Sequence, residues 1–470
     1  MKDIYLVSYS VSGIKTIDRL VTLSFYKKII SPEPDTSDYN VKGIYGINGS
    51  GKSGIIASVD ILKSLLTNPE YLNNPVVQKK LDAMINKKTE KLFIRAEFIS
   101  GFGKGPWLFR YEITLQRAAS RKYVISGEEF SFRKATSKNS SMETLFKVCD
   151  GEIVDLKGKQ DNFPGDGVYK KTMNRLSAST LCALCYDGQL MRLFLYYVML
   201  SRNNTVSVFE GLILLMIFGE KLCVYLDAAD EHKEYLIRNL ADYLNELKEE
   251  AVCDFGQLFN FAKMYKNQIG MITVSENRIP RTVYRDFELT VGKLCEFLKI
   301  FKSDLRRIEI DKKEDQDIYI CSLIMVYDSY KIHAEFESTG VKKLIRLFAY
   351  LRKMVQGGIV FIDEFDSNLH DVYLCALLEY LMEYGEGQLC FTTHNVGPMD
   401  ILRHHKKSID FLSEDHQIYP WTTNGNYSPS KLYRNGMIEG SPFNVDSIDF
   451  ISAFGPEKGI MKRNKRKYQS

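Results

Sequence analysis

The sequence lacks the features of several protein classes. Its longest apolar run, Gly211 to Gly219, is too short to cross a bilayer. The N-terminus shows no basic segment followed by an apolar one, so no secretory leader is expected. The nine cysteines form no regular framework, and the CxxC pair of Cys182 and Cys185 has no second ligand pair for zinc. We therefore expect a cytoplasmic protein with free thiols and no membrane partner.

The chain also lacks a strong excess of charge. Its 470 residues carry a net charge of +4, and the last ten residues contain five of the positive side chains. The rest of the chain is therefore nearly neutral. A basic end of this kind is typical of a solvated terminus, and its alternative is a contact with phosphate groups or an acidic partner.

One glycine-rich segment, Gly43 to Ser53, contains the complete pattern of a phosphate-binding loop. Its fixed positions are Gly46, Gly51, Lys52 and Ser53. A strand is expected over 41–45, and apolar residues recur at helical spacing from 55 to 66. Backbone N–H groups at the start of such a helix bind phosphates, Lys52 reaches the β- and γ-phosphates, and Ser53 ligates Mg²⁺.

A second segment, Gly358 to Glu364, is apolar and ends in two acids. This pattern is typical of a buried parallel strand that delivers carboxylates to its C-terminal end. Beside a phosphate-binding loop, Asp363 would organise Mg²⁺ through its water shell. Glu364 would orient or deprotonate the attacking water.

A third segment, Phe336 to Gly340, precedes an amphipathic helix. Ser338 and Gly340 stand where a hydroxyl and a backbone N–H could meet a phosphate, although the same pattern also describes an ordinary helix cap. The order then continues with 366–370 directly after the acids, and with a buried strand that ends at His394.

This ordered set resembles the ABC-type ATPase head of the SMC, RecF and OLD-like class. GINGSGKS is similar to its Walker A motif, including Asn48 and Gly49, and GIVFIDE is similar to its Walker B motif. ESTG resembles its signature motif in the form found in small bacterial defence ATPases. DSNLH resembles its D-loop, with Ser367 and Asn368, and TTH resembles the strand that carries the switch histidine, His394.

The resemblance covers roughly 1–150 and 300–450 and has further implications. Lys15, between two N-terminal strands, is similar to the family's basic residue that approaches the nucleotide. The signature differs from the transporter form LSGGQ, so this is not a transporter domain. The D-loop also differs, because His370 stands where transporters carry Asp. Gln189 is the only position we suggest for the glutamine loop.

The implied fold class is α/β, a P-loop NTPase with an ABC-type ATPase head, an antiparallel β subdomain and a helical insertion. The expected parts are the first part of the head at 1–168, a helical lobe for oligomerisation or partner docking at 169–300, the second part of the head at 301–455 and a basic tail at 456–470. Strand patterns are expected in the first 30 residues, from 92 to 150, and at 305–311, 318–328 and 331–338.

The resemblance implies a mechanism with ATP and Mg²⁺ as cofactors. Two heads enclose two ATP molecules, and Lys52 and Ser53 of one head face Ser338 and Gly340 of the other. The segment after His394 shows neither an acidic metal cluster nor an HNH pattern, so a nuclease or toxin activity is expected on a separate chain. Septu, PARIS and retron-associated ATPases have this arrangement, which implies a sensor and scaffold subunit in antiphage defence.

Two other functions stay open at this point. In a RecF-like role in DNA maintenance, the chain itself would grip nucleic acid through a lysine-rich surface and the basic tail. The lysines are Lys79, Lys80, Lys87, Lys88 and Lys91. Helix-surface lysines are more often simply solvated. The other function is a signalling switch without a nuclease. His404 and His405 are expected to be a polar helix end rather than a site.

Overall fold

The computed structural model describes residues 4–68, 71–101, 106–137, 140–157, 208–226, 272–422 and 427–441. Three features expected from the sequence lie outside these ranges, namely the pair Cys182 and Cys185, Gln189, and the basic tail at 456–470. The expected insertion is described only over 208–226 and 272–300. Within the described ranges, no helix has the length and the apolar character needed to cross a bilayer.

A mostly parallel sheet lies at the centre of the molecule. Its order is β17 (Ile418–Pro420), β16 (Ile409–Leu412), β3 (Val41–Tyr45), β15 (Gln388–Thr392), β14 (Ile359–Ile362) and β9 (Leu222–Tyr225). Only β17 pairs in the antiparallel sense. All residues of β3, β9, β14 and β15 are buried. Both faces of these strands are therefore covered, which explains why apolar and polar residues do not alternate along them. The predicted α/β fold class is confirmed.

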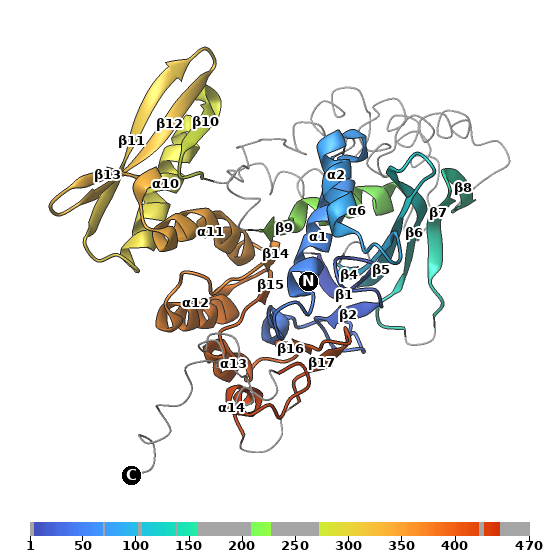
Figure 1. Cartoon of the computed structure of the whole chain (residues 1–470). Coiled ribbons are helices and arrows are strands. Elements are labelled where there is room, and N and C mark those ends of the chain that lie inside the picture. The colour runs from blue at the N-terminus through green and yellow to red at the C-terminus, as the bar shows by residue number, and fades with distance from the viewer. Residues whose placement is uncertain are drawn as a thin grey trace, which may run out of the picture.

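The two faces of this sheet belong to different hydrophobic cores. Along β14, Ile359 and Phe361 share a core with α1 (Lys52–Thr67) and α6 (Val208–Lys221). Val360 and Ile362, on the opposite face, pack with α11 (Thr339–Val355) and α12 (Asp371–Tyr384). The short helices α13 (Gly397–Leu402) and α14 (Pro429–Arg434) contribute to this second core (Figure 1).

An antiparallel sheet packs on the same side of the central sheet as α1 and shares its hydrophobic core (Figure 1). Its order is β2 (Val21–Ser24), β1 (Tyr5–Ser12), β4 (Lys91–Ser100), β5 (Trp107–Arg117), β6 (Tyr123–Lys134), β7 (Glu143–Cys149) and β8 (Glu152–Leu156). Aromatic rings fill its inner face, and Phe98 stacks on Phe218 of α6 with ring centroids 4.4 Å apart. The short elements η1 (Ser37–Tyr39), η2 (Tyr71–Asn73) and α2 (Pro75–Met84) connect the two sheets.

A small sheet lies beside the first half of α11 (Figure 1). It consists of β10 (Glu276–Pro280), β12 (Ile318–Tyr327), β11 (Leu305–Asp315) and β13 (Lys331–His333). The turn η3 (Arg281–Val283) leads from β10 into α10 (Tyr284–Lys299), which buries its apolar face against this sheet.

Two expectations about local structure are wrong. Helices were expected throughout 169–300, but β9 is a strand of the central sheet and β10 belongs to the small sheet. The strand expected over 331–338 ends at His333, where the side chain accepts a hydrogen bond from the Glu335 N–H and begins the turn η4 (Ala334–Phe336). The range 169–300 therefore contributes to two sheets in addition to any helical insertion.

Candidate nucleotide-binding and hydrolysis site

The phosphate-binding loop, residues 46–53, connects the end of β3 to the start of α1. Gly46 and Gly51 have φ values of 154° and 104°, which side-chain-bearing residues rarely adopt. A Cβ on Gly46 would lie 2.4 Å from the Leu412 carbonyl oxygen, and one on Gly51 would lie 2.6 Å from Ile17. Both glycines are therefore required by backbone conformation and by space, which leaves the loop N–H groups at the helix N-terminus.

Lys52 is buried at the start of α1, with 6% of its surface exposed. Its Nζ donates hydrogen bonds to the carbonyl oxygens of Gly46 at 2.7 Å and Ile47 at 2.9 Å. Desolvation lowers the pKa of Lys52 to about 8, while nearby carboxylates act in the opposite direction. These carboxylates belong to Asp363, Glu364 and Asp366. The structure thus brings the loop lysine and the predicted acid pair, Asp363 and Glu364, to one edge of the central sheet.

The acid pair follows β14 and is held by the neighbouring strand β15. The Thr392 hydroxyl donates to Asp363 Oδ1 at 2.6 Å and accepts from the Glu364 N–H at 2.8 Å. The Thr392 carbonyl also accepts from the Phe365 N–H at 3.0 Å. Because β3, β14 and β15 are parallel, their C-terminal ends meet at the same edge. Sequence reasoning included Thr392 in the TTH segment, two residues before the predicted histidine, but gave it no role.

His394 lies two residues beyond β15, at this same edge of the sheet. Desolvation lowers the pKa of His394 below its usual value, and the Lys52 ammonium lowers it further. The three carboxylates that act on Lys52 also act on His394 and raise its pKa. A neutral imidazole beside the acid pair can accept or donate a hydrogen bond to a phosphate or a water.

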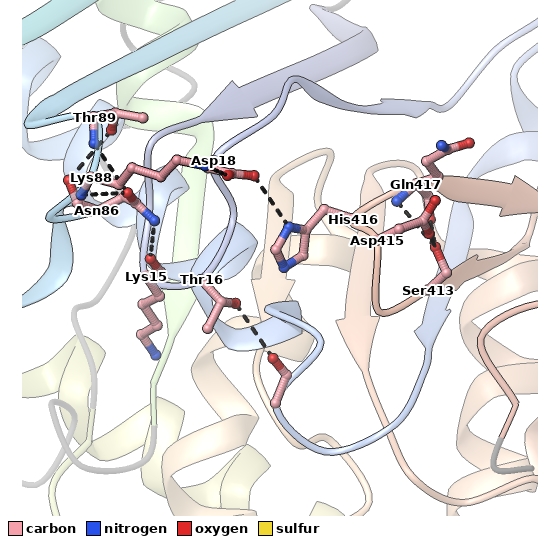
Figure 2. A network of polar contacts seen from close by, with 11 residues as sticks. Lys15, Thr16, Asp18, Asn86, Lys88, Thr89, Ser413, Asp415, His416 and Gln417 are labelled. Carbon is pink, nitrogen blue, oxygen red and sulfur yellow. Dashed lines mark hydrogen bonds and ion pairs between the residues drawn. The ribbon is translucent and has the colours of Figure 1, made fainter.

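Lys15 lies in the turn that follows β1, beside the phosphate-binding loop. Its N–H donates to the Met84 carbonyl at 2.6 Å, and its carbonyl accepts from Asn86 Nδ2 at 2.8 Å. A Cβ on Gly54 would lie 3.6 Å from the Lys15 side chain, which places that chain along the first turn of α1. The hydroxyl of Thr16 donates to the Gly49 carbonyl at 3.4 Å (Figure 2).

A polar network extends from this turn to the connection between β16 and β17. Figure 2 shows Asp18 between Lys88 and His416, with an Nζ–Oδ2 distance of 2.9 Å to Lys88 and an Nδ1–Oδ1 distance of 3.6 Å to His416. The network links the turn after β1 to the α2–β4 connection through Lys88 and to the β16–β17 connection through His416. Sequence reasoning did not find it, because its members are far apart in the chain.

The signature segment, Glu337–Gly340, caps helix α11. The Ser338 hydroxyl accepts from the Val341 N–H at 3.4 Å, and Ser338 is exposed. A Cβ on Gly340 would lie 2.8 Å from the Asn368 carbonyl oxygen, so the signature segment packs closely on the D-loop, Asp366–His370, of the same chain. The described contacts of Ser338 and Gly340 are with these neighbours rather than with the phosphate-binding loop.

Lysines proposed for DNA binding are mostly paired within the chain. Lys80, Lys87 and Lys88 form ion pairs with Asp60, Asp82 and Asp18, at distances of 3.2, 2.8 and 2.9 Å. These carboxylates offset the charge that a phosphate backbone would meet on this surface. His404 and His405 follow α13, and their N–H groups donate to the Ile401 and Leu402 carbonyls, as expected of a polar helix end.

The residues present fit a nucleotide with Mg²⁺. The buried Lys52 ammonium has only neutral carbonyl oxygens as its described hydrogen-bond partners, and phosphate oxygens would replace them with charged acceptors. A Mg²⁺ ion bound with a nucleotide is typically held by one or two protein oxygens together with phosphates and water. Ser53 and Asp363 are the residues that would hold it.

Comparisons with known proteins show similarity to ATPases. Residues 260–400 match the family described as "AAA domain, putative AbiEii toxin, Type IV TA system". The chain is 23% identical over 428 residues to "Retron Vc95 probable ATPase" of Vibrio cholerae serotype O1 biovar El Tor, covering 84% of this chain and 73% of the relative.

Two solved structures align with most of the chain. One is an SMC head bound to the C-terminal winged-helix domain of ScpA, with 13% identity, a TM-score of 0.44 and coverage of 89% of this chain and 98% of the other. The other is the recombination mediator RecF, with 12% identity, a TM-score of 0.38 and coverage of 90% and 99%. Because both scores are below 0.5, the fold class rests on the sheet order and the loop themselves. The chain is an α/β P-loop ATPase that resembles the retron-associated ATPase and the AbiEii-type AAA domain.

Proposed function

We propose that this ATPase is the sensor and scaffold subunit of a bacterial antiphage defence system. It would control a separate effector, a nuclease or a toxin, whose release stops growth of the infected cell. The similarity to a retron ATPase and to an AbiEii-type domain supports this context. The described cysteines are free, which suits a reducing cytoplasm.

The control step in this proposal is ATP-dependent pairing of two heads. The loop residues Lys52 and Ser53 of one head would face Ser338 and Gly340 of a second copy. Support comes from the exposure of Ser338 at the N-terminus of a 17-residue helix, where a phosphate of a partner-bound nucleotide is favoured. Because each site would be divided between two chains, ATP binding would close the pair and hydrolysis would reopen it.

Each residue of the site has a defined part in hydrolysis. Gly46, Asn48, Gly49 and Gly51 shape the loop that surrounds the phosphates. Mg²⁺, held by Ser53 and through water by Asp363, would neutralise charge on the β- and γ-phosphates. Glu364 would orient the attacking water and accept its proton, and His394 would hydrogen-bond to the γ-phosphate. Lys15 would add a positive charge beside the nucleotide, and Ser367 and Asn368 would line the contact between heads.

The observation that carries this proposal is the meeting of Lys52, the acid pair and His394 at one sheet edge while Ser338 remains exposed. Glu364→Gln should therefore bind ATP, hydrolyse it slowly and accumulate as a closed dimer. Light scattering after gel filtration with ATP measures the dimer, and phosphate release measures turnover. Full turnover by Glu364→Gln would show that the carboxylate does not act on the water.

The effector can be identified with the same variant. Tagged Glu364→Gln, purified from its native host, should retain a stoichiometric nuclease or toxin in the ATP-bound state. Lys52→Ala is the control, because it should not bind ATP. Recovery of DNA without any protein partner would contradict the defence role and would favour a RecF-like role in DNA maintenance.

A further inference from the structure

Lys343 is a buried lysine that none of the sequence motifs includes. It lies in the second turn of α11, and only 2% of its surface is exposed. Its Nζ donates to the Glu364 carbonyl oxygen at 2.6 Å and to the Ser367 hydroxyl, and lies 5.8 Å from the centre of the Tyr225 ring. A buried ammonium is costly unless hydrogen bonds compensate for lost water, so its contacts must be maintained.

The residue that Lys343 contacts has an unusual backbone conformation. Glu364 has a φ of 48°, in the left-handed region that is unfavourable for residues with a side chain. Its N–H donates to the Thr392 hydroxyl, and its carbonyl accepts from the Lys343 ammonium at 2.6 Å and from the Ser367 N–H at 3.1 Å. Both polar backbone groups of Glu364 are therefore held, each by a different element. Such strain persists only where the surrounding structure enforces it.

We propose that Lys343 is a positioning residue for ATP hydrolysis. Together with Thr392, it fixes the backbone of Glu364. The fixed backbone sets the direction in which the Glu364 side chain points from the end of β14. This inference rests on the proposed role of Glu364. Because α11 begins at the signature segment, Lys343 also connects that segment to the acid pair, and its contact with Ser367 includes the D-loop in the same unit.

Lys343→Met tests the role, because methionine keeps the length and apolar body of the side chain but removes the donors. We expect kcat for ATP to fall between about 10- and 100-fold, since a small displacement of a catalytic group is enough for such a loss. The Kd for a fluorescent non-hydrolysable ATP analogue should change less than about threefold. A purely structural role would lower thermal stability without separating kcat from Kd in this way.

Lys221 provides a matched control within the chain. It too is 2% exposed, and its Nζ donates to a backbone carbonyl, that of Gly357, at 2.9 Å. It lies where β9 and β14 begin, at the opposite edge of the central sheet from the acid pair. Lys221→Met should lower the melting temperature while leaving kcat per folded molecule within about twofold of the wild type.

A double mutant distinguishes an action through Glu364 from an independent one. If Lys343 works by positioning Glu364, adding Lys343→Met to Glu364→Gln should not reduce the residual rate further. An additional tenfold loss would overturn the proposal, and so would a wild-type kcat in folded Lys343→Met. Wild-type turnover by Glu364→Gln alone would overturn both this inference and the proposed function. A failure of the proposed function can therefore be distinguished from a failure of this inference alone.

Thr392→Val keeps the test decisive if Lys343→Met does not fold. Valine has nearly the same shape as threonine but cannot accept from the Glu364 N–H or donate to Asp363. The expected result is again a lower kcat with a nearly unchanged Kd for the analogue. A folded Thr392→Val variant with wild-type kcat would contradict the view that Glu364 must be held at its backbone.

Discussion

At the scale of single residues, the surroundings of the Lys52 ammonium favour an anionic ligand. It is buried, its described hydrogen bonds go to two carbonyl oxygens of its own loop, and three carboxylates lie near enough to affect its pKa. Carbonyl oxygens are weaker partners for an ammonium than phosphate oxygens. Lys52 is therefore expected to favour the charged form more strongly once a nucleotide is bound.

This difference predicts a pH dependence of ATP binding. The pKa of Lys52 is about 8 in the free protein, and bound phosphates should raise it. Binding should therefore take up protons near pH 8, and the affinity should fall roughly tenfold between pH 7 and pH 9 as the free lysine loses its charge. Calorimetry in two buffers with different ionisation enthalpies measures the uptake.

A charge that does not titrate in this range serves as the control for the pH experiment. Lys52→Arg keeps a positive charge to beyond pH 9, so whatever affinity it retains should not vary over that interval. Binding to the wild type without proton uptake at pH 8 would show that another group, and not Lys52, faces the phosphates.

The site residues that could be predicted are those whose chemistry is indicated by their spacing within one short segment of the sequence. Gly46, Gly51 and Lys52 belong to one such loop, and Asp363 and Glu364 to one strand end. Thr392 and Lys343 could not be predicted, because their contacts with Glu364 span 28 and 21 residues and exist only once β15 and α11 pack on β14. The roles of the loop and strand-end residues, like those of Ser338, Gly340, Lys15 and His394, stay predictions until they are tested.

At the scale of elements, a buried ion pair joins two neighbouring strands of the central sheet, β3 and β16. Lys42 of β3 and Asp410 of β16 are 1% and 2% exposed, and their Nζ–Oδ2 distance is 2.7 Å. Lys42→Met would leave the Asp410 carboxylate buried without its partner. The free energy of unfolding should then fall by about 3–5 kcal/mol, which urea denaturation followed by circular dichroism measures.

The double variant Lys42→Met and Asp410→Leu should recover most of this loss, because apolar side chains of similar volume can replace a buried pair. Lys406, which pairs with Asp38 at 2.6 Å on the surface, is the control, and Lys406→Met should have little effect. If Lys42→Met unfolds at the same urea concentration as the wild type, the pair does not stabilise the contact between β3 and β16.

Long elements with a regular apolar pattern could be predicted from the sequence. Short elements could not, because they are defined by the segments with which they pair. The apolar spacing of 55–66 predicts α1, and alternation predicts the strands between 92 and 150. The four residues of β9 directly follow α6 and are as apolar as that helix, so periodicity cannot separate them. Pairing with β14, from Leu222 to Tyr225, is what makes this segment a strand.

At the scale of the whole molecule, the proposed ATP site has two parts that the described structure does not bring into contact, the phosphate-binding loop and the signature segment. The phosphate-binding loop and the acid pair meet at the edge of the central sheet, while the signature segment is exposed at the start of α11 and packs on the D-loop. A chain with this arrangement can complete a site with the complementary surface of a second copy. Two such contacts related by a two-fold axis form a closed dimer with two sites.

Mixing two inactive variants tests this arrangement. Lys52→Ala removes the phosphate-binding function, and Ser338→Arg blocks the signature segment, so each protein alone should lack ATPase activity. In a random mixture, half of the dimers combine the two chains, and each of these contains one site built from the intact loop of one chain and the intact signature of the other. The mixture should therefore recover about a quarter of the wild-type rate, measured by phosphate release.

The recovered rate depends on chain exchange, which provides the internal check on the mixing experiment. Activity should appear only after the two proteins are incubated together, and it should be greatest at an equimolar ratio. Covalent linkage of the two variants in one polypeptide should raise it to about half of the linked wild type, because every molecule then contains one intact site. Activity in Ser338→Arg alone would place the complete site within one chain and would exclude head pairing as the control step.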